Sequence, residues 1–159
     1  MSDVIQLRYM DKAKLPKGEW TDEHDLELWT DEGTGYRCLV VRTSVGTLCG
    51  YVEVPNSHPW HNVEYDDCVA VPNCGDKWCQ HGPDSTVDVH GGLTFSGDRD
   101  HVVGSGWWFG FDCAHSWDLS PHMLGEGCAS YGGSTYRDVS YVREECMILA
   151  RQLALEVSA

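Results

Sequence analysis

From Asp25 onward, apolar and polar residues alternate in the way that half-buried strands require. Leu26 and Leu28 are spaced by two, and two apolar runs follow at Cys38–Val41 and Leu48–Val54. Turn-forming residues separate the three runs, and Pro55 ends the last one. Short turns between consecutive strands favour antiparallel pairing, so this part of the chain predicts a three-stranded antiparallel meander.

Two more runs have strand character, Thr86–Phe95 and Gly106–Cys113, and the polar segment 96–105 joins them. Both contain internal glycines, which indicate bulges or a close approach of a ligand to the backbone. Near the C-terminus the period changes to that of an amphipathic helix over about Asp138–Val157, with Thr135 or Asp138 as its N-cap. We therefore expect an α+β fold in one domain, residues 1–159, with an antiparallel sheet of five or more strands and the C-terminal helix packed on one face.

Two segments lack such periodicity. Residues 1–21 mix acidic and basic side chains and predict an irregular lead-in, whereas residues 56–84 form a long connection rich in Cys, His and Pro. Connections of roughly 30 residues inside a domain are usually functional or organised by a metal.

The long connection contains a candidate structural zinc site formed by Cys68, Cys74, Cys79 and His81. Thiolates and imidazole are preferred zinc ligands, and a tetrahedral site would order a segment with few apolar residues. The gaps of five and four residues between the cysteines differ from the paired C-x2-C spacing of common zinc sites. Free thiols, partly buried as small apolar groups, are therefore the alternative.

Charge and composition limit the classes of partner. The 159 residues include 11 Lys and Arg against 25 Asp and Glu, a net charge of −14, which disfavours binding to a nucleic-acid polymer. The N-terminal residues lack the apolar stretch of an export signal, and no apolar run is long enough to span a membrane. We expect a cytoplasmic protein that does not bind membranes and whose 8 Cys are thiols or metal ligands. The sequence does not indicate an oligomeric state.

The first candidate for chemistry is the run Asp88-Val89-His90-Gly91-Gly92. In a strand, Asp88 and His90 would lie on one face, where a carboxylate can orient an imidazole as a general base or a metal ligand. The two glycines would let a ligand approach backbone N–H groups. A polar strand end followed by a glycine bulge is the structural alternative.

A second run, Trp107–Asp118, again places Asp and His directly after an apolar strand. Because the two strands are expected to be neighbours, we predict that His90, Asp112 and His115 lie in one cleft. In an enzyme these three would be the catalytic residues, with the histidines as acid and base. Trp107, Trp108 and Trp117 could stack on a flat heterocycle, although at least one of the first two is expected in the core because adjacent strand residues face opposite sides.

Residues 131–138 lead into the predicted helix, where Arg137 and backbone N–H groups could bind an anion. The motifs of P-loop enzymes, α/β hydrolases, zincins and dinucleotide-binding enzymes do not occur. The complete set of predicted ligand-binding residues is Asp88, His90, Gly91, Gly92, Thr94, Trp108, Asp112, His115, Asp118 and Arg137.

The strings His90-Gly91-Gly92-Leu93-Thr94-Phe95 and Gly110-Phe111-Asp112-Cys113-Ala114-His115 resemble those of a family of small uncharacterised proteins from bacteriophage and prophage genomes. The similarity extends from the Cys49-Gly50-Tyr51-Val52 strand to Tyr141-Val142-Arg143, about two thirds of the chain. The resemblance implies a phage accessory protein that acts inside the bacterial host, and many such proteins counter host defence. It implies no role for any single residue.

Two functions fit these observations. The first is a binding protein that sequesters a small nucleotide-derived signalling molecule through stacking, glycine N–H groups and the His/Asp cluster. The second is a hydrolase, with or without a metal, that cleaves such a nucleotide with His90, Asp112 and His115. A pocket with local cations can bind an anionic ligand inside an acidic surface. The first function is slightly preferred from sequence because no complete catalytic signature is present.

Overall fold

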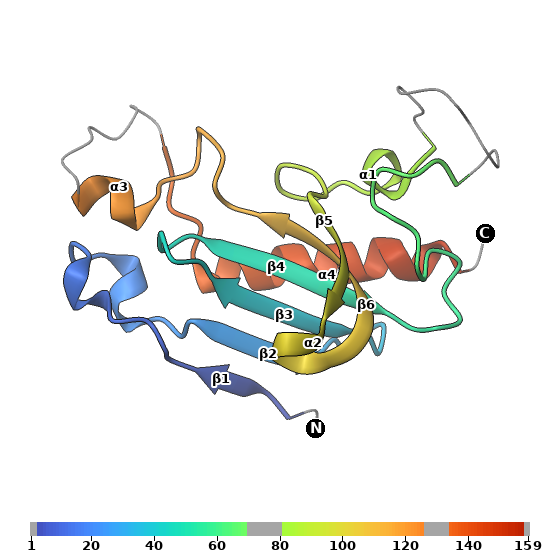
Figure 1. The fold of residues 1–159 in the computed structure, drawn as a ribbon, viewed down its shortest axis with the longest axis horizontal. Coiled ribbons are helices and arrows are strands. Elements are labelled where there is room, and N and C mark those ends of the chain that lie inside the picture. Colours follow the sequence, from blue (N-terminus) through green and yellow to red (C-terminus); the bar gives the residue numbers. More distant parts are fainter. Residues whose placement is uncertain (1–2, 70–80, 126–133, 158–159) are drawn as a thin grey trace.

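The structure is a computed structural model that describes residues 3–69, 81–125 and 134–157. One six-stranded antiparallel sheet has the order β1-β2-β3-β4-β6-β5, and helix α4 crosses one of its faces (Figure 1). This confirms the predicted α+β class. The strands are β1 Ile5–Leu7, β2 Leu26–Thr30, β3 Arg37–Arg42, β4 Leu48–Val54, β5 Phe95–Arg99 and β6 Gly104–Asp112. The α-helices are α1 Pro83–Thr86, α2 Asp100–Val103, α3 Pro121–Gly125 and α4 Val139–Leu155.

Strands β2, β3 and β4 form the predicted meander. Leu39 in the middle strand lies opposite Leu28 on one side and opposite Tyr51 on the other. The turn before β4 contains Gly46 with a φ of 93°, a left-handed conformation that costs glycine little. The short connections and the period of two were therefore sufficient to predict this half of the sheet.

The predicted strand at Thr86–Phe95 is wrong in its bounds. The strand that pairs with β6 begins at Phe95, opposite Gly110, and runs to Arg99. Gly91 and Gly92 have φ angles of 67° and 81°, so the chain turns between residues 89 and 92 and cannot continue as a strand. His90 is consequently a turn residue placed before the sheet edge.

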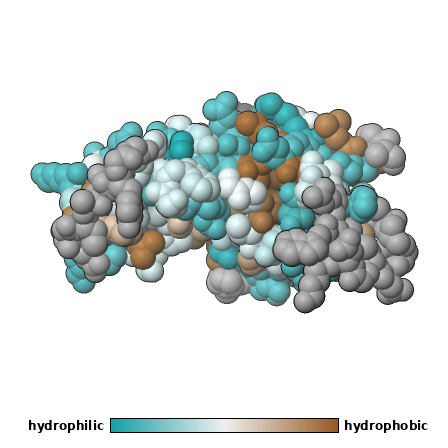
Figure 2. Space-filling view, turned by 90° about the horizontal axis from the view of Figure 1, so that it is seen from above, coloured by the Kyte–Doolittle hydropathy of each residue, from teal (hydrophilic) through white to brown (hydrophobic). Residues whose placement is uncertain are grey.

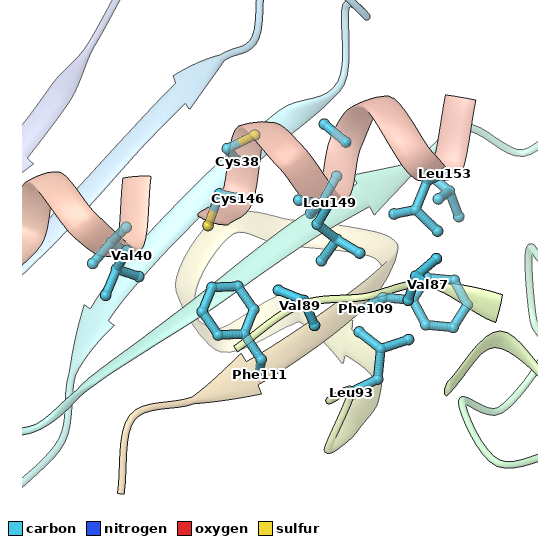
Figure 3. Close-up of a cluster of buried hydrophobic side chains, with 14 of the residues drawn as sticks. Cys38, Val40, Val87, Val89, Leu93, Phe109, Phe111, Cys146, Leu149 and Leu153 are labelled. Atoms are coloured by element: carbon cyan, nitrogen blue, oxygen red, sulfur yellow. The ribbon is translucent and has the colours of Figure 1, made fainter. Parts of the chain in front are cut away.

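Helix α4 begins as expected, because the Asp138 side chain accepts a hydrogen bond from the N–H of Tyr141 at 2.7 Å. Its apolar stripe packs against β3 and β4 and encloses the main core (Figure 3). Within this core, Phe109 and Phe111 of β6 face Leu149 and Leu153 of α4, and all four side chains are buried. Burying each such side chain contributes about 1.5–3 kcal/mol, so this layer is a principal source of stability.

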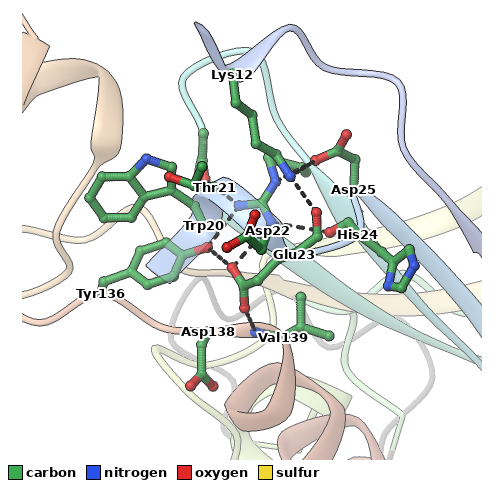
Figure 4. Close-up of polar contacts among 12 residues, drawn as sticks. Lys12, Trp20, Thr21, Asp22, Glu23, His24, Asp25, Tyr136, Asp138 and Val139 are labelled. Atoms are coloured by element: carbon green, nitrogen blue, oxygen red, sulfur yellow. Dashed lines mark hydrogen bonds and ion pairs between the residues drawn. The ribbon is translucent and has the colours of Figure 1, made fainter. Parts of the chain in front are cut away.

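The lead-in is more ordered than predicted, since it contains β1 and two short 3₁₀ helices, η1 Lys12–Lys14 and η2 Glu19–Asp22. It is tied to α4 by a buried polar cluster (Figure 4). The Glu23 carboxylate accepts the Tyr136 hydroxyl at 2.6 Å and the N–H of Val139, the first residue of α4, at 2.7 Å. Arg42 donates to Asp25 at 2.8 Å and to the Tyr136 hydroxyl at 2.7 Å. These contacts fix the segment that enters the helix.

The other sheet face has a smaller cluster built on Leu39, Tyr51 and Trp108. Trp108 is fully buried there, while Trp107 packs against the helix-side core, so the two adjacent tryptophans face opposite sides as expected. On the face seen from above, hydrophobic residues gather mainly in one band, with hydrophilic residues beside it (Figure 2). Among the described residues, no helix is long and apolar enough to cross a membrane.

Candidate functional site

The site is built where β6 ends. A tight turn follows Asp112, in which the Asp112 carboxylate accepts the N–H of Ala114 at 3.1 Å and the N–H of Asp118 donates to the carbonyl of His115 at 2.9 Å. Thr135 then pairs with the residues on either side of Asp118, donating to Trp117 and accepting from Leu119. The turn therefore places His115 and Asp118 beside the start of helix α4.

His90 reaches the same place from the glycine turn before β5. Val89 anchors that turn in the core, and the N–H of Gly92 closes it on the carbonyl of Val89 at 2.8 Å. Gly91 lies directly against the His115 ring, because a Cβ at this position would be 2.1 Å from Cε1 of His115. Only glycine, with no Cβ, allows the two histidines to approach so closely, and their ring centroids are 5.5 Å apart.

Asp118 is the centre of the site. Its carboxylate is fully buried, and its Oδ2 accepts His90 Nε2 at 2.9 Å, His115 Nδ1 at 3.0 Å and the N–H of His115 at 3.1 Å. Its Oδ1 accepts Arg137 Nε at 3.0 Å. Burial alone would raise the pKa of this carboxyl, but the hydrogen bonds from His90, His115 and Arg137 outweigh burial and lower the pKa below its usual value. Asp118 is therefore an ionised acceptor.

The hydrogen bonds assign the two imidazoles different roles. A carboxylate only accepts, so His115 must carry its proton on Nδ1 and His90 must carry a proton on Nε2. The other nitrogen of His90, Nδ1, is 2.8 Å from the Tyr141 hydroxyl, so both ring nitrogens of His90 are occupied. No described residue forms a hydrogen bond to Nε2 of His115, whose side chain is 20% exposed. Nε2 of His115, which lies against Gly91, thus has no hydrogen-bond partner among the described residues.

Trp117 and Arg137 are two further groups of the site. The Trp117 ring stacks on the His115 ring at 4.6 Å with an interplanar angle of 6°, and Trp117 is 48% exposed. Arg137 lies over the Tyr141 ring at 4.9 Å, and among the described residues its terminal amino groups have no acceptor. Burial and the Glu145 carboxylate raise the pKa of Tyr141 to about 12, so its hydroxyl stays protonated beside His90.

Sequence reasoning did not include Tyr141 in the site. The available signal was its position four residues after Arg137 at the start of an amphipathic helix, where the two side chains share a face. That spacing is equally typical of a solvent-exposed pair, and only the fold brings His90 against it.

Most of the predicted site residues are brought together. His90, His115 and Asp112 converge, although Asp112 Oδ1 is 3.8 Å from His115 Nδ1 and Asp118 is the closer partner. Thr94 donates to the other Asp112 oxygen at 3.1 Å and so fixes that carboxylate.

Two predicted ligand-binding residues lie elsewhere. Trp108 is buried on the sheet face opposite α4, because odd and even residues of β6 point to opposite sides. Asp88 is exposed, and its backbone N–H and carbonyl are hydrogen-bonded to the Gln152 side chain near the far end of α4. Neither is positioned beside the His115 ring.

The predicted zinc site in the long connection stays a prediction. Cys74 and Cys79 lie outside the described residues. Cys68 is half-buried and His81 is exposed.

A different group of residues could hold a metal ion, namely His90, His115 and Asp118. One ligand atom from each lies within 4.8 Å of the other two. Two imidazoles and one carboxylate are ligands that suit zinc and other divalent transition metals.

Comparisons of the chain with protein families, with curated proteins and with solved structures find no match.

Proposed function

We propose that the protein is a hydrolase that cleaves a small nucleotide-derived molecule, with His115 as its general base. The observation that carries this proposal is the hydrogen bond from His115 Nδ1 to the buried Asp118, which leaves Nε2 unpaired among the described residues. An imidazole held in this tautomer by a carboxylate is the standard arrangement for accepting a proton from water or a hydroxyl group.

The proposed hydrolysis needs only the nucleotide and water. Nε2 of His115 takes a proton from water as the water oxygen forms a bond to phosphorus, and the phosphorus bond to the leaving oxygen breaks. The same imidazolium then returns the proton to the leaving oxygen. Asp118 stays ionised and stabilises the transient imidazolium, in keeping with its lowered pKa. His90, with both nitrogens bonded, positions Asp118 and exchanges no proton with the substrate.

Two neighbouring groups support a nucleotide as the substrate class. The terminal nitrogens of Arg137 can bind phosphate oxygens, since its Nε already binds Asp118 and fixes the guanidinium plane. The exposed face of Trp117 offers a stacking surface for a base, a contact that contributes about 1–3 kcal/mol in nucleic-acid systems.

Sequestration without cleavage is the second candidate. The observation that favours it is the stacked Trp117–His115 pair, which is a ready-made platform for a flat ring even when no proton moves. The resemblance to phage proteins implies a setting for either activity, because removing a nucleotide signal in the host cytoplasm would counter a defence that depends on it.

Metal-assisted hydrolysis is a variant of the first proposal. His90, His115 and Asp118 would hold a divalent ion, and that ion would supply the activation of water in place of the His115 base. Activity that disappears with a chelator and returns with zinc or manganese would identify this variant. Activity that is unaffected by a chelator would support the direct role of His115.

The deciding experiment incubates the protein with a panel of cyclic and ADP-ribose-type nucleotides, then denatures it and analyses the released molecules. We expect one nucleotide to yield products well beyond one equivalent of protein, and His115→Ala to abolish this turnover. Intact nucleotide recovered in proportion to protein would establish sequestration. The absence of both turnover and binding across the whole panel would contradict both candidate functions.

A further inference from the structure

The charges of this acidic protein are unevenly distributed along the chain. Residues 3–22, the lead-in to the end of η2, contain four basic side chains and four carboxylates and are neutral within a total of −14. The basic residues are Arg8, Lys12, Lys14 and Lys17. All four belong to the lead-in, which wraps one end of the sheet beside β2 (Figure 1). Basic side chains that line one hollow can attract anions within an otherwise negative protein.

The lead-in forms most of the wall of an open pocket of about 560 Å³. Its lining residues are Arg8, Met10, Lys12, Ala13, Leu15, Lys17, Thr21 and Asp25. The volume is in the range of small-molecule sites, roughly 300–1,000 Å³. Cationic groups and an apolar wall made by Met10, Ala13 and Leu15 therefore share one hollow.

The single carboxylate in the lining does not oppose an anion. Asp25 is fully buried and accepts hydrogen bonds from the N–H groups of Tyr9 and Met10, both at 2.8 Å. Lys12 Nζ is 2.9 Å and Arg42 Nε is 2.8 Å from the same carboxylate. These partners lower the pKa of Asp25 against the opposing effect of burial, and its charge is neutralised inside the protein.

The cationic groups at the opening keep donors for a ligand. Arg8 uses one terminal nitrogen on the carbonyl of Asp22 at 2.8 Å, and its other N–H groups have no acceptor among the described residues. The Lys17 ammonium likewise has no described partner, and it is exposed. The Thr21 hydroxyl accepts the N–H of Gly18 at 3.0 Å, which leaves its proton free to donate.

We propose that this pocket is a second binding site, independent of the Asp118 site, for a small multivalent anion bearing phosphate or carboxylate groups. Arg8 and Lys17 bind the anionic groups, Thr21 donates a further hydrogen bond, and the uncharged part of the ligand rests on Met10 and Leu15. Bidentate binding by the Arg8 guanidinium favours planar or tetrahedral oxyanions over halide ions.

Calorimetric titration of the full chain with inorganic pyrophosphate and with citrate, at constant ionic strength, tests the proposal. We expect saturable binding of at least one of them with one site per chain. Arg8→Gln and Lys17→Gln should each weaken it about tenfold, since each removes a charge-assisted hydrogen bond. Lys14→Gln is the matched control, because Lys14 has the same charge and belongs to the same segment but does not line the pocket.

The comparison of the two anions tells a phosphate ligand from a carboxylate ligand. Equal weakening by Lys14→Gln would show diffuse surface attraction and overturn the proposal, as would the absence of saturable binding. An acidic peptide that binds while neither small anion does would assign the surface to a protein partner and also overturn it. His115→Ala should retain the anion affinity, so failure of the hydrolase proposal would leave this result intact.

Discussion

A glycine pair beside His115 allows the site geometry to be tested with two nearly identical substitutions. Gly91 and Gly92 both have left-handed φ angles, 67° and 81°. A Cβ at Gly91 would lie 2.1 Å from Cε1 and 2.4 Å from Nε2 of His115, whereas a Cβ at Gly92 would have no atom within 4 Å. Gly91→Ala and Gly92→Ala therefore share the backbone cost and differ in their effect on His115.

The magnitudes follow from these distances. The left-handed conformation costs a residue other than glycine about 1–2 kcal/mol, so both variants should unfold more easily by at least that amount. In Gly91→Ala the ring must also move by about 1.3 Å to restore an ordinary contact of 3.4 Å. A displacement of this size strains or breaks the 3.0 Å hydrogen bond to Asp118, and a misplacement of about 1 Å can reduce turnover by about 10²-fold.

Denaturant unfolding measures the first effect, and nucleotide turnover together with the NMR signals of the His115 ring measures the second. We expect Gly91→Ala to be destabilised more than Gly92→Ala, because it also strains the hydrogen bond from His115 to Asp118. Turnover and ring signals should stay near normal in Gly92→Ala and be largely lost in Gly91→Ala. Equal disturbance of the His115 signals by Gly92→Ala and Gly91→Ala, or unchanged signals in Gly91→Ala, would contradict the contact between Gly91 and His115.

Four further results are expected. Asp118→Asn should lower the unfolding free energy by about 1–3 kcal/mol at pH 7, because it weakens a buried hydrogen-bonded acceptor. Since the folded-state pKa of Asp118 is lowered, its charge stabilises the fold above the unfolded-state pKa of about 3.9, and the difference between wild type and Asp118→Asn should shrink as the pH falls below about 4. Leu149→Ala should cost about 2–5 kcal/mol in denaturant unfolding, because the side chain is fully buried under the sheet. Cys113 and Cys146 should resist alkylation in the native protein and react after unfolding, since burial raises the pKa of both thiols.

Much of the fold could be predicted because its signals are local. The meander has short turns and a period of two, and α4 has a long apolar stripe with an Asp138 cap. The alternation around His90 was misleading because Gly91 and Gly92 interrupt it, and their left-handed angles produce a turn. Ile5–Leu7 is too short to show a period, and its pairing with β2 is set by tertiary contacts.

The site was only partly predictable. Asp112 and Asp118 are each three residues from His115, so spacing cannot tell which carboxylate binds the ring. The turn after β6 decides the matter, since it brings Asp118 to 3.0 Å and leaves Asp112 at 3.8 Å. Asp118 is also the one that the fold buries against Arg137, which is a contact across 19 residues of sequence.

The proposed function depends most on which nitrogen of the His115 ring carries the proton, and nitrogen NMR of the neutral histidine side chains measures this directly. His115 should be protonated on Nδ1 with Nε2 unprotonated, His90 should be protonated on Nε2, and Asp118→Asn should remove the fixed tautomer of His115. A His115 ring protonated on Nε2, or one that exchanges freely between tautomers in the wild-type protein, would contradict the assignment of His115 as the proton acceptor of the site.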